Sequence, residues 1–97
     1  MEHSYCVYIL ASGRNGTLYV GVTNNLSKRV WAHREGSAST FTARYGVHRL
    51  VYYERYDYIP AAIEREKRLK RWRRAGKIAL IEDRNPQWLD PYETLNQ

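Results

Sequence analysis

Two short segments near the start of the sequence alternate between apolar and polar or aromatic side chains. Residues 5–11 and 18–23 show this period of two and are rich in β-branched and aromatic residues, which predicts a pair of β-strands. Asn15-Gly16 between them is the strongest short signal of a two-residue hairpin turn. We therefore expect an antiparallel hairpin whose turn pairs Arg14 with Thr17.

The next segment has the pattern of a helix. It begins after a suitable N-cap, Asn24 or Asn25, and is expected to run to about Glu35, where Gly36 stops it. The small and polar residues 37–47 that follow are typical of a loop.

The second half of the chain predicts a third strand and two further helices. Residues 48–56 alternate again and are rich in β-formers. Pro60 suits the first turn of a long helix, which we expect to run to about Ala75 and to end at Gly76. A short helix is expected over residues 77–83.

Length and composition fit one small globular domain. The chain has 97 residues, of which 43% are hydrophobic and 27% charged, and this excludes a disordered tail or a fibre. The order ββαβαα predicts the α+β class, with a small three-stranded antiparallel sheet flanked by helices and residues 1–97 forming a single domain. A lone cysteine, Cys6, excludes an internal disulfide and a zinc site of paired cysteines. Without a membrane-length apolar run or a signal peptide, we expect a cytoplasmic protein that does not bind membranes.

Positive charge is concentrated in one stretch of the chain. Residues 65–77 contain 8 basic side chains and one acidic side chain, so they carry +7, whereas the whole protein carries +6. Such a patch attracts a polyanion, and nucleic acid is the leading candidate. The alternative is a solvated helix face without a partner.

The hairpin places two tyrosines on one face. In the expected register, and in any register shifted by two, Tyr8 and Tyr19 point to the same side, and Gly21 leaves room beside them. Tyrosine is also a common strand residue, so the pair is either ordinary strand composition or part of a site.

The first helix carries two cationic or titratable side chains beside its apolar stripe. Leu26 and Val30 are expected to be buried, and Arg29 and His33 lie at the edge of that packed face. A cation held at such an edge is expected to have a partner, because leaving it unpaired is costly. The partner is either an acidic side chain in a structural ion pair or a phosphate or substrate.

The second long helix carries one carboxylate on its inward stripe. Glu66 shares this stripe with Ala62, Leu69 and Arg73, whereas its neighbours, Arg65 among them, are expected to point outward. An inward carboxylate is either a salt-bridge anchor or a ligand for a hard divalent cation.

These residues resemble a known family. Cys6-Val-Tyr8 and Tyr19-Val-Gly21 resemble the two signature tripeptides of the GIY-YIG nuclease superfamily. The likeness is to a small stand-alone bacterial group related to the UvrC N-terminal nuclease domain. It covers nearly the whole chain, through residues 23–30, 41–42, 50–54, 62–72, 77–82 and 85–88.

The resemblance implies catalytic roles for five side chains. Tyr19 resembles the tyrosine that activates or orients the attacking water, and Tyr8 would support it and help to place the scissile phosphate. Arg29 would hold that phosphate and stabilise its growing charge. His33 falls where relatives place a second polar residue of the active site, and Glu66 matches the carboxylate that binds a single Mg²⁺ or Mn²⁺.

The implied function is divalent-metal-dependent hydrolysis of phosphodiester bonds in DNA, including branched or damaged DNA of the kind met in repair. A unit of 11.5 kDa is too small to include an elaborate targeting domain, so we also expect that it can act as a homodimer or with a partner protein. The side chains expected to contact nucleic acid are Lys28, Thr42, Lys67, Lys70, Arg71, Arg73 and Arg74.

Two positions depart from the family pattern. Cys6 replaces the first glycine of the signature, and a strand accepts this change. Val22 stands where the superfamily often has a lysine, so one cation of the site is missing. This second departure leaves open a module on the same fold that binds nucleic acid without cutting it.

Overall fold

The computed structural model describes residues 4–91, and these form a three-stranded antiparallel sheet with helices on both faces. The predicted α+β class and all three strands are confirmed, and one short helix is additional. In chain order the elements are β1 (Tyr5–Ala11), β2 (Leu18–Thr23), α1 (Leu26–Arg34), α2 (Thr40–Tyr45), β3 (Arg49–Tyr56), α3 (Ile59–Arg71) and α4 (Arg74–Arg84).

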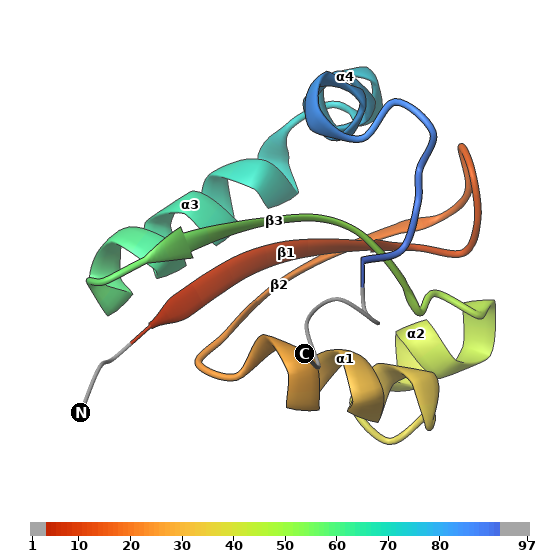
Figure 1. The fold of residues 1–97 in the computed structure, drawn as a ribbon, viewed down its shortest axis with the longest axis horizontal. Helices are drawn as coiled ribbons and strands as arrows, with labels where there is room; N and C mark the ends of the chain where they lie inside the picture. The colour runs from red at the N-terminus through yellow and green to blue at the C-terminus, as the bar shows by residue number, and fades with distance from the viewer. Residues whose placement is uncertain (1–3, 92–97) are drawn as a thin grey trace.

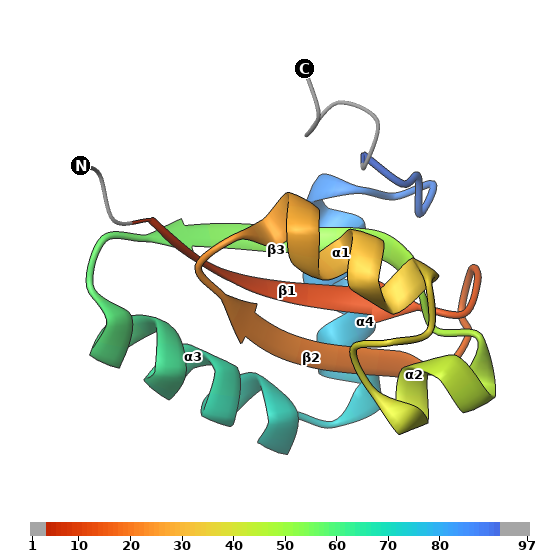
Figure 2. The ribbon, with the colours of Figure 1, turned by 90° about the horizontal axis from the view of Figure 1, so that it is seen from below.

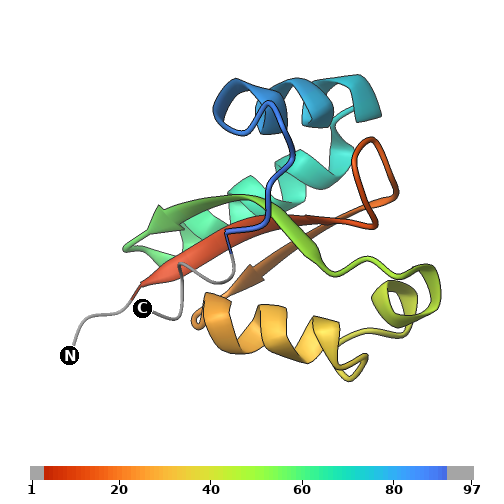
Figure 3. The ribbon, with the colours of Figure 1, turned by 45° about the vertical axis from the view of Figure 1, so that its right-hand side comes forward.

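The first strand is the centre of the sheet. The strand order is β2-β1-β3, and β1 is antiparallel to both neighbours. Helices α1 and α2 lie on one face of the sheet, and α3 and α4 lie on the other (Figure 1, Figure 3). Figure 2 shows α3 on the side of β2, which is one free edge of the sheet. The sheet is therefore enclosed on both faces, and its β2 edge lies between helices from opposite layers.

The turn between β1 and β2 is longer than expected. Ala11 pairs with Leu18, so the register is shifted by two residues and the expected pairing of Arg14 with Thr17 is wrong. Ser12 closes the longer loop, since its amide donates to the Thr17 carbonyl (3.0 Å) and its hydroxyl accepts from the Thr17 amide (2.9 Å). A shift of two preserves the parity of every side chain, so the predicted faces of the hairpin are correct.

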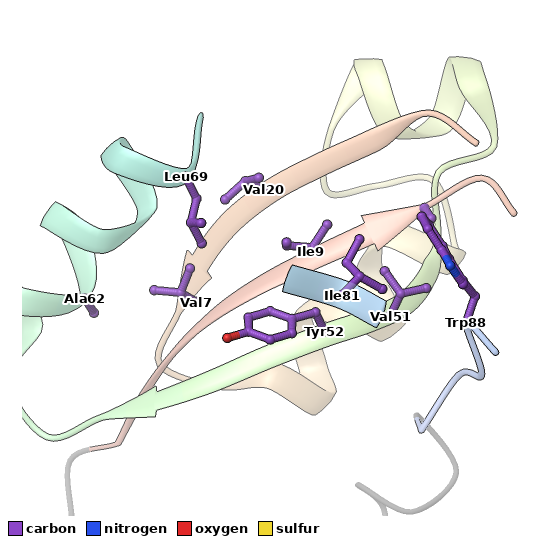
Figure 4. Close-up of a cluster of buried hydrophobic side chains, with 10 residues drawn as sticks. Val7, Ile9, Val20, Val51, Tyr52, Ala62, Leu69, Ile81 and Trp88 are labelled. Carbon is purple, nitrogen blue, oxygen red and sulfur yellow. The ribbon is translucent and has the colours of Figure 1, made fainter. Parts of the chain in front are cut away.

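Alternate residues of β1 belong to two separate hydrophobic clusters. Odd-numbered residues face α3 and α4, and even-numbered residues face α1 and α2. Figure 4 shows the first cluster, whose buried members are Val7, Ile9, Ala11, Val20, Val51, Tyr52, Ala62, Leu69, Ile81 and Trp88. The second contains Cys6, Tyr8, Leu10, Leu26, Val30, Val47 and Leu50.

Helix α1 forms as the sequence predicts. Asn25 is its N-cap, and the Asn25 Oδ1 accepts a hydrogen bond from the Lys28 amide (3.1 Å). Leu26 and Val30 are buried as expected. His33 is also fully buried, at 1% exposure, and does not lie at the edge of the packed face.

Helix α2 lies where the sequence analysis expected a loop. Ser39 caps it by accepting from the Thr42 amide (3.4 Å), and Gly46 ends it in the left-handed conformation with φ 64°. Thr42 is its only buried residue. A helix of six residues with one buried position has no hydrophobic period, so the pattern could not reveal it.

The long helix expected to end at Gly76 is two helices. Trp72 and Arg73 are both extended, with ψ 147° and 153°, so α3 ends before them and α4 begins after them. Gly76 lies inside α4 and is not a terminator. Arg73 is exposed beyond α3, so its expected place on the inward stripe is wrong.

A long-range contact explains where α4 begins. Arg74, its first residue, donates hydrogen bonds from Nη2 to the carbonyl oxygens of Asn15 and Gly16, both at 2.6 Å. This contact holds the N-terminal end of α4 against the β1–β2 loop. Such a contact depends on the tertiary fold and leaves no local signal in the sequence.

A polar cluster connects β3 to α3. The Glu54 carboxylate accepts hydrogen bonds from Tyr52, from Tyr56 (2.7 Å) and from the Arg65 Nε (2.6 Å). The Arg65 guanidinium also lies 5.2 Å from the centre of the Trp72 ring. Arg65 was expected to point outward, and this is wrong because Glu54 offers it a half-buried partner.

Among residues 4–91, no helix is long and apolar enough to cross a membrane.

We expect Glu54→Gln to lower the free energy of unfolding by about 2 kcal/mol, because it removes one partner of a half-buried ion pair. Burial alone would raise the pKa of Glu54, but hydrogen bonds from Arg65, Tyr52 and Tyr56 outweigh it and hold that pKa below its ordinary value. The stabilisation is therefore complete above the pKa of the unfolded chain and is lost as the pH falls. Urea denaturation at a series of pH values measures both effects.

Glu64→Gln is the matched control. Glu64 pairs with Arg68 on the solvent side of α3, where both side chains are more than 60% exposed. This variant should change stability by no more than about 0.5 kcal/mol. Equal losses in the two variants at neutral pH would contradict the role given to Glu54.

Candidate active site

Tyr8 extends from the central strand toward the β2 edge. It lies directly opposite Gly21 on β2, and its ring passes over that glycine. A Cβ at position 21 would lie 2.4 Å from the Tyr8 hydroxyl oxygen, so no other residue leaves room for the ring. The space that the sequence analysis expected beside the two tyrosines is thus occupied by Tyr8 itself.

A chain of hydrogen bonds continues from Tyr8 into α1 and α2. The Tyr8 hydroxyl lies 3.0 Å from the His33 Nε2, and the His33 Nδ1 lies 2.9 Å from the Thr42 Oγ1. The Thr42 hydroxyl donates to the Ser39 carbonyl (3.2 Å). It therefore accepts from the His33 Nδ1–H, which leaves Nε2 to accept from the Tyr8 hydroxyl.

Burial keeps both rings of this chain neutral. Burial raises the pKa of Tyr8 to about 12, against the opposing effect of Arg29. Burial and the charge of Arg29 lower the pKa of His33 to about 4. At neutral pH Tyr8 therefore keeps its proton, and its hydroxyl donates a hydrogen bond to the uncharged imidazole of His33.

Tyr19 and Arg29 complete one side of the cluster. The Tyr19 ring centre lies 6.4 Å from that of Tyr8 and 5.2 Å from that of His33. Arg29 makes a side-chain contact with Tyr8 that favours the phenolate, and its guanidinium is only partly exposed. Two tyrosines, an arginine and a histidine from β1, β2 and α1 are thus brought together.

Glu66 approaches the same tyrosine from the opposite layer. Its side chain is 15% exposed, and it pairs with the exposed Lys70 at 3.2 Å. Its charge acts on Tyr8, where it opposes ionisation of the phenol. A groove lined by Val22, Arg29, Ile59 and Ile63, among others, crosses the β2 edge between α1 and α3.

The donor set at Glu66 suits a hard divalent cation. Among the described residues, no group of three or more His, Cys, Asp or Glu side chains could form a metal cage. Mg²⁺ and Mn²⁺ accept a single protein carboxylate, because they keep several waters and bind phosphate oxygens of a substrate. Glu66 pairs with Lys70, whose side chain is 52% exposed and can move away.

Of the seven residues expected to contact nucleic acid, two make contacts within the protein and five are exposed. Thr42 is buried at 1% exposure and its hydroxyl is bonded to His33, so it supports the site from inside and does not reach a surface ligand. Arg74 is exposed but holds the β1–β2 loop. The other five are exposed, and they are Lys28, Lys67, Lys70, Arg71 and Arg73.

The two departures from the family pattern have different surroundings. Cys6 is buried at 3% exposure, and burial raises the pKa of its thiol, so it packs as a small apolar residue. Val22 is partly buried, packs against the cluster under α3 and lines the groove beside Arg29. The place of the missing lysine is therefore apolar, and Arg29 is the cation that lines this groove.

Sequence reasoning did not identify the part played by α2. The Phe41 ring centre lies 6.3 Å from that of Tyr19. The Ser39 carbonyl accepts from Thr42 the last hydrogen bond of the series that begins at Tyr8. The only signal was Phe41 itself, a large apolar residue in an otherwise small and polar segment.

The chain is similar to known proteins over most of its length. Residues 4–79 match the family described as the GIY-YIG catalytic domain. The chain is 38% identical over 79 residues to a UPF0213 protein of Clostridium perfringens, covering 81% of this chain and 84% of the relative. It is 36% identical to a UPF0213 protein of Natronomonas pharaonis, covering 86% and 96%. The solution NMR structure of a UPF0213 protein from Bacillus halodurans superposes with a TM-score of 0.55 at 26% identity, covering 88% and 89%.

We expect His33 to titrate with a pKa of about 4 and to carry its proton on Nδ1 at neutral pH. Its folded-state pKa lies below that of an unfolded histidine, so its contribution to stability is lost as the pH falls. Nitrogen-15 NMR of the imidazole ring reports both the pKa and the tautomer. Thr42→Val removes the acceptor for Nδ1–H at nearly constant volume and should lower the population of this tautomer.

A proton on Nε2 of His33 in the unmodified protein at neutral pH would overturn the assigned direction of the hydrogen bonds.

Proposed function

The chain belongs to the GIY-YIG family of nuclease domains, and from this premise we propose that it is a divalent-metal-dependent endonuclease that hydrolyses phosphodiester bonds in DNA. One observation carries the proposal. Tyr8, Tyr19, Arg29 and His33 form a single cluster at the β2 edge, and Glu66 acts on Tyr8 from the other side of that edge. These five residues come from four elements, β1, β2, α1 and α3, and the elements lie in different layers of the fold.

Arg29 would bind the scissile phosphate. A planar guanidinium matches two phosphate oxygens and stays charged at any relevant pH. Hydrolysis adds negative charge to the phosphate as water attacks, and a fixed, partly buried cation stabilises that charge more than it stabilises the substrate. The contact of Arg29 with Tyr8 would hold the guanidinium in place for this role.

Tyr19 would orient and activate the attacking water. Tyr8 is unsuited to accept a proton, since its pKa is about 12 and its hydroxyl already donates to His33. Tyr19 is only partly buried, and its ring lies beside that of Tyr8, which Arg29 contacts. A water held against its hydroxyl would lie next to the phosphate bound by Arg29.

Glu66 would hold the metal ion of the site. A bound Mg²⁺ or Mn²⁺ supplies Lewis-acid stabilisation of the phosphate oxygens and of the leaving group. The Glu66 carboxylate would then bind the ion in place of Lys70. The exposed Lys70 side chain is free to move into solvent.

The exposed cations of α3 and of the segment after it would contact the DNA backbone. Phosphate contacts of this kind hold a nucleic acid without reading its sequence. Branched or damaged DNA is the first substrate class to test, and the protein would act alone, as a homodimer or with a partner.

We expect Glu66→Ala and Arg29→Ala each to lower the cleavage rate by about 100-fold or more. Cleavage of intact, nicked and branched DNA by the purified protein with Mg²⁺ or Mn²⁺ is the measurement. Glu64→Ala, two residues earlier on the solvent face of α3, should keep the rate of the unmodified protein. Cleavage that persists in Glu66→Ala and in Arg29→Ala would show that a contaminant cuts the DNA.

A module that binds nucleic acid without cutting it is the second candidate, and the apolar Val22 beside Arg29 favours it. For either candidate, we expect Lys67, Arg71 and Arg73 changed together to glutamate to weaken DNA binding and to reduce its salt dependence. Each lost phosphate contact lowers the slope of log affinity against log salt by about 0.9. Binding measured by anisotropy in EDTA separates affinity from cleavage. Unchanged affinity and slope would exclude this face as the DNA contact.

A further inference from the structure

Helix α2 presents two adjacent aromatic rings, tilted by 50° to each other, to solvent beside the candidate active site. Phe41 and Tyr45 lie one helical turn apart, are 44% and 51% exposed, and have ring centres 5.0 Å apart. Phe41 also stacks on Tyr19, with ring centres 6.3 Å apart and an interplanar angle of 29°. The rings thus form a continuous aromatic row from Tyr19 to the surface of α2.

The row is fixed relative to the active site. Thr42 lies between the two exposed rings in sequence, but its side chain points inward and binds His33. Ser39 and Gly46 cap the two ends of the helix. The contacts that hold His33 in position therefore also fix the orientation of Phe41, so the rings keep a constant place next to Tyr19.

The surroundings of the row suit a polyanion. Residues 36–53 contain no acidic side chain, and the Arg44 guanidinium lies 5.7 Å from the centre of the Tyr45 ring. A shallow hollow at the start of α2 is lined by Ser37, Ser39, Thr40 and Arg44, among others, and Arg44 is the residue that also contacts the Tyr45 ring. Hydroxyls and a cation of this kind are suited to contact sugar and phosphate groups.

We propose that Phe41 and Tyr45 form a stacking site for an unpaired base next to the scissile phosphate. Every base has a π face, and stacking on exposed aromatic rings beside cations is how proteins hold single strands. A base inside a duplex has both faces covered and must first be unstacked. The substrates favoured by this site are therefore nucleic acids with single-stranded or unstacked nucleotides at the cleavage position. This inference rests on the proposed nuclease function, because it takes Tyr19 and Arg29 as the place of the phosphate.

The test measures binding of the full chain to DNA in EDTA, where no cleavage interferes. Fluorescence anisotropy compares a short single-stranded DNA with a blunt duplex of the same length. We expect Phe41→Ala to weaken single-strand binding by about 10-fold and Phe41→Ala with Tyr45→Ala to weaken it further, with little change for the duplex. Phe41→Tyr should retain binding, and Phe41→Leu, which keeps apolar bulk but loses the π face, should not.

Trp31→Ala is the matched control. Trp31 is 53% exposed on α1 and is not part of the row, so its loss should leave both affinities unchanged. The His33 imidazole NMR signals verify that each variant keeps the active-site hydrogen bonds.

Three results would overturn the inference. They are an unchanged single-strand affinity in Phe41→Ala, an equal loss for single strand and duplex, or a dimer that Phe41→Ala converts to a monomer, which would make the row a contact between two chains. Failure of the nuclease proposal is distinct, because it appears as absent cleavage or as cleavage that does not need Glu66.

Discussion

The candidate site depends on the passage of the Tyr8 ring over Gly21. Tyr8 belongs to the central strand, whereas Arg29, His33 and Glu66 come from helices that flank the edge strand. The Tyr8 ring reaches the edge by crossing over β2, and this requires that β2 carry no side chain at the crossing point. Gly21 meets that requirement, and a Cβ there would lie only 2.4 Å from the Tyr8 hydroxyl oxygen. The glycine of the signature is thus required by the shape of its partner.

The same crossing determines the chemistry available to each tyrosine. Tyr8 is buried by its passage and is bonded to His33, so it acts as a neutral donor that positions the imidazole and Arg29. Tyr19 lies next to it on the edge strand and stays partly accessible, in contact with Phe41. Two chemically identical side chains therefore have different surroundings because one lies on a middle strand and the other on an edge. Val22 adds no charge to the groove that it lines beside Arg29.

Much of this architecture could be predicted from local patterns, and some of it could not. Alternation located the three strands and the faces of the hairpin, and helical spacing identified Leu26 and Val30 as buried. The positions of the two tyrosines, Arg29 and Glu66 followed from the same parity and spacing, with the family resemblance joining them into one site. The break after α3 and the inward course of Arg65 are set by partners on other elements, and the longer turn and the short helix α2 are closed by Ser12, Ser39 and Gly46, whose hydrogen bonds leave no hydrophobic period. Burial of His33 was also missed, because its partner Thr42 lies on the helix that the pattern could not reveal.

The central position of β1 also affects the order in which the protein can become active. Its pairing with β2 needs only a short loop, but its pairing with β3 joins Tyr5 to Tyr56, and Glu66 lies farther along the chain. Contacts close in sequence form before distant ones, and synthesis on the ribosome proceeds from the N-terminus. A nascent chain thus presents both tyrosines well before it can supply the carboxylate. The five side chains of the candidate site can therefore come together only after α3 has been synthesised and packed.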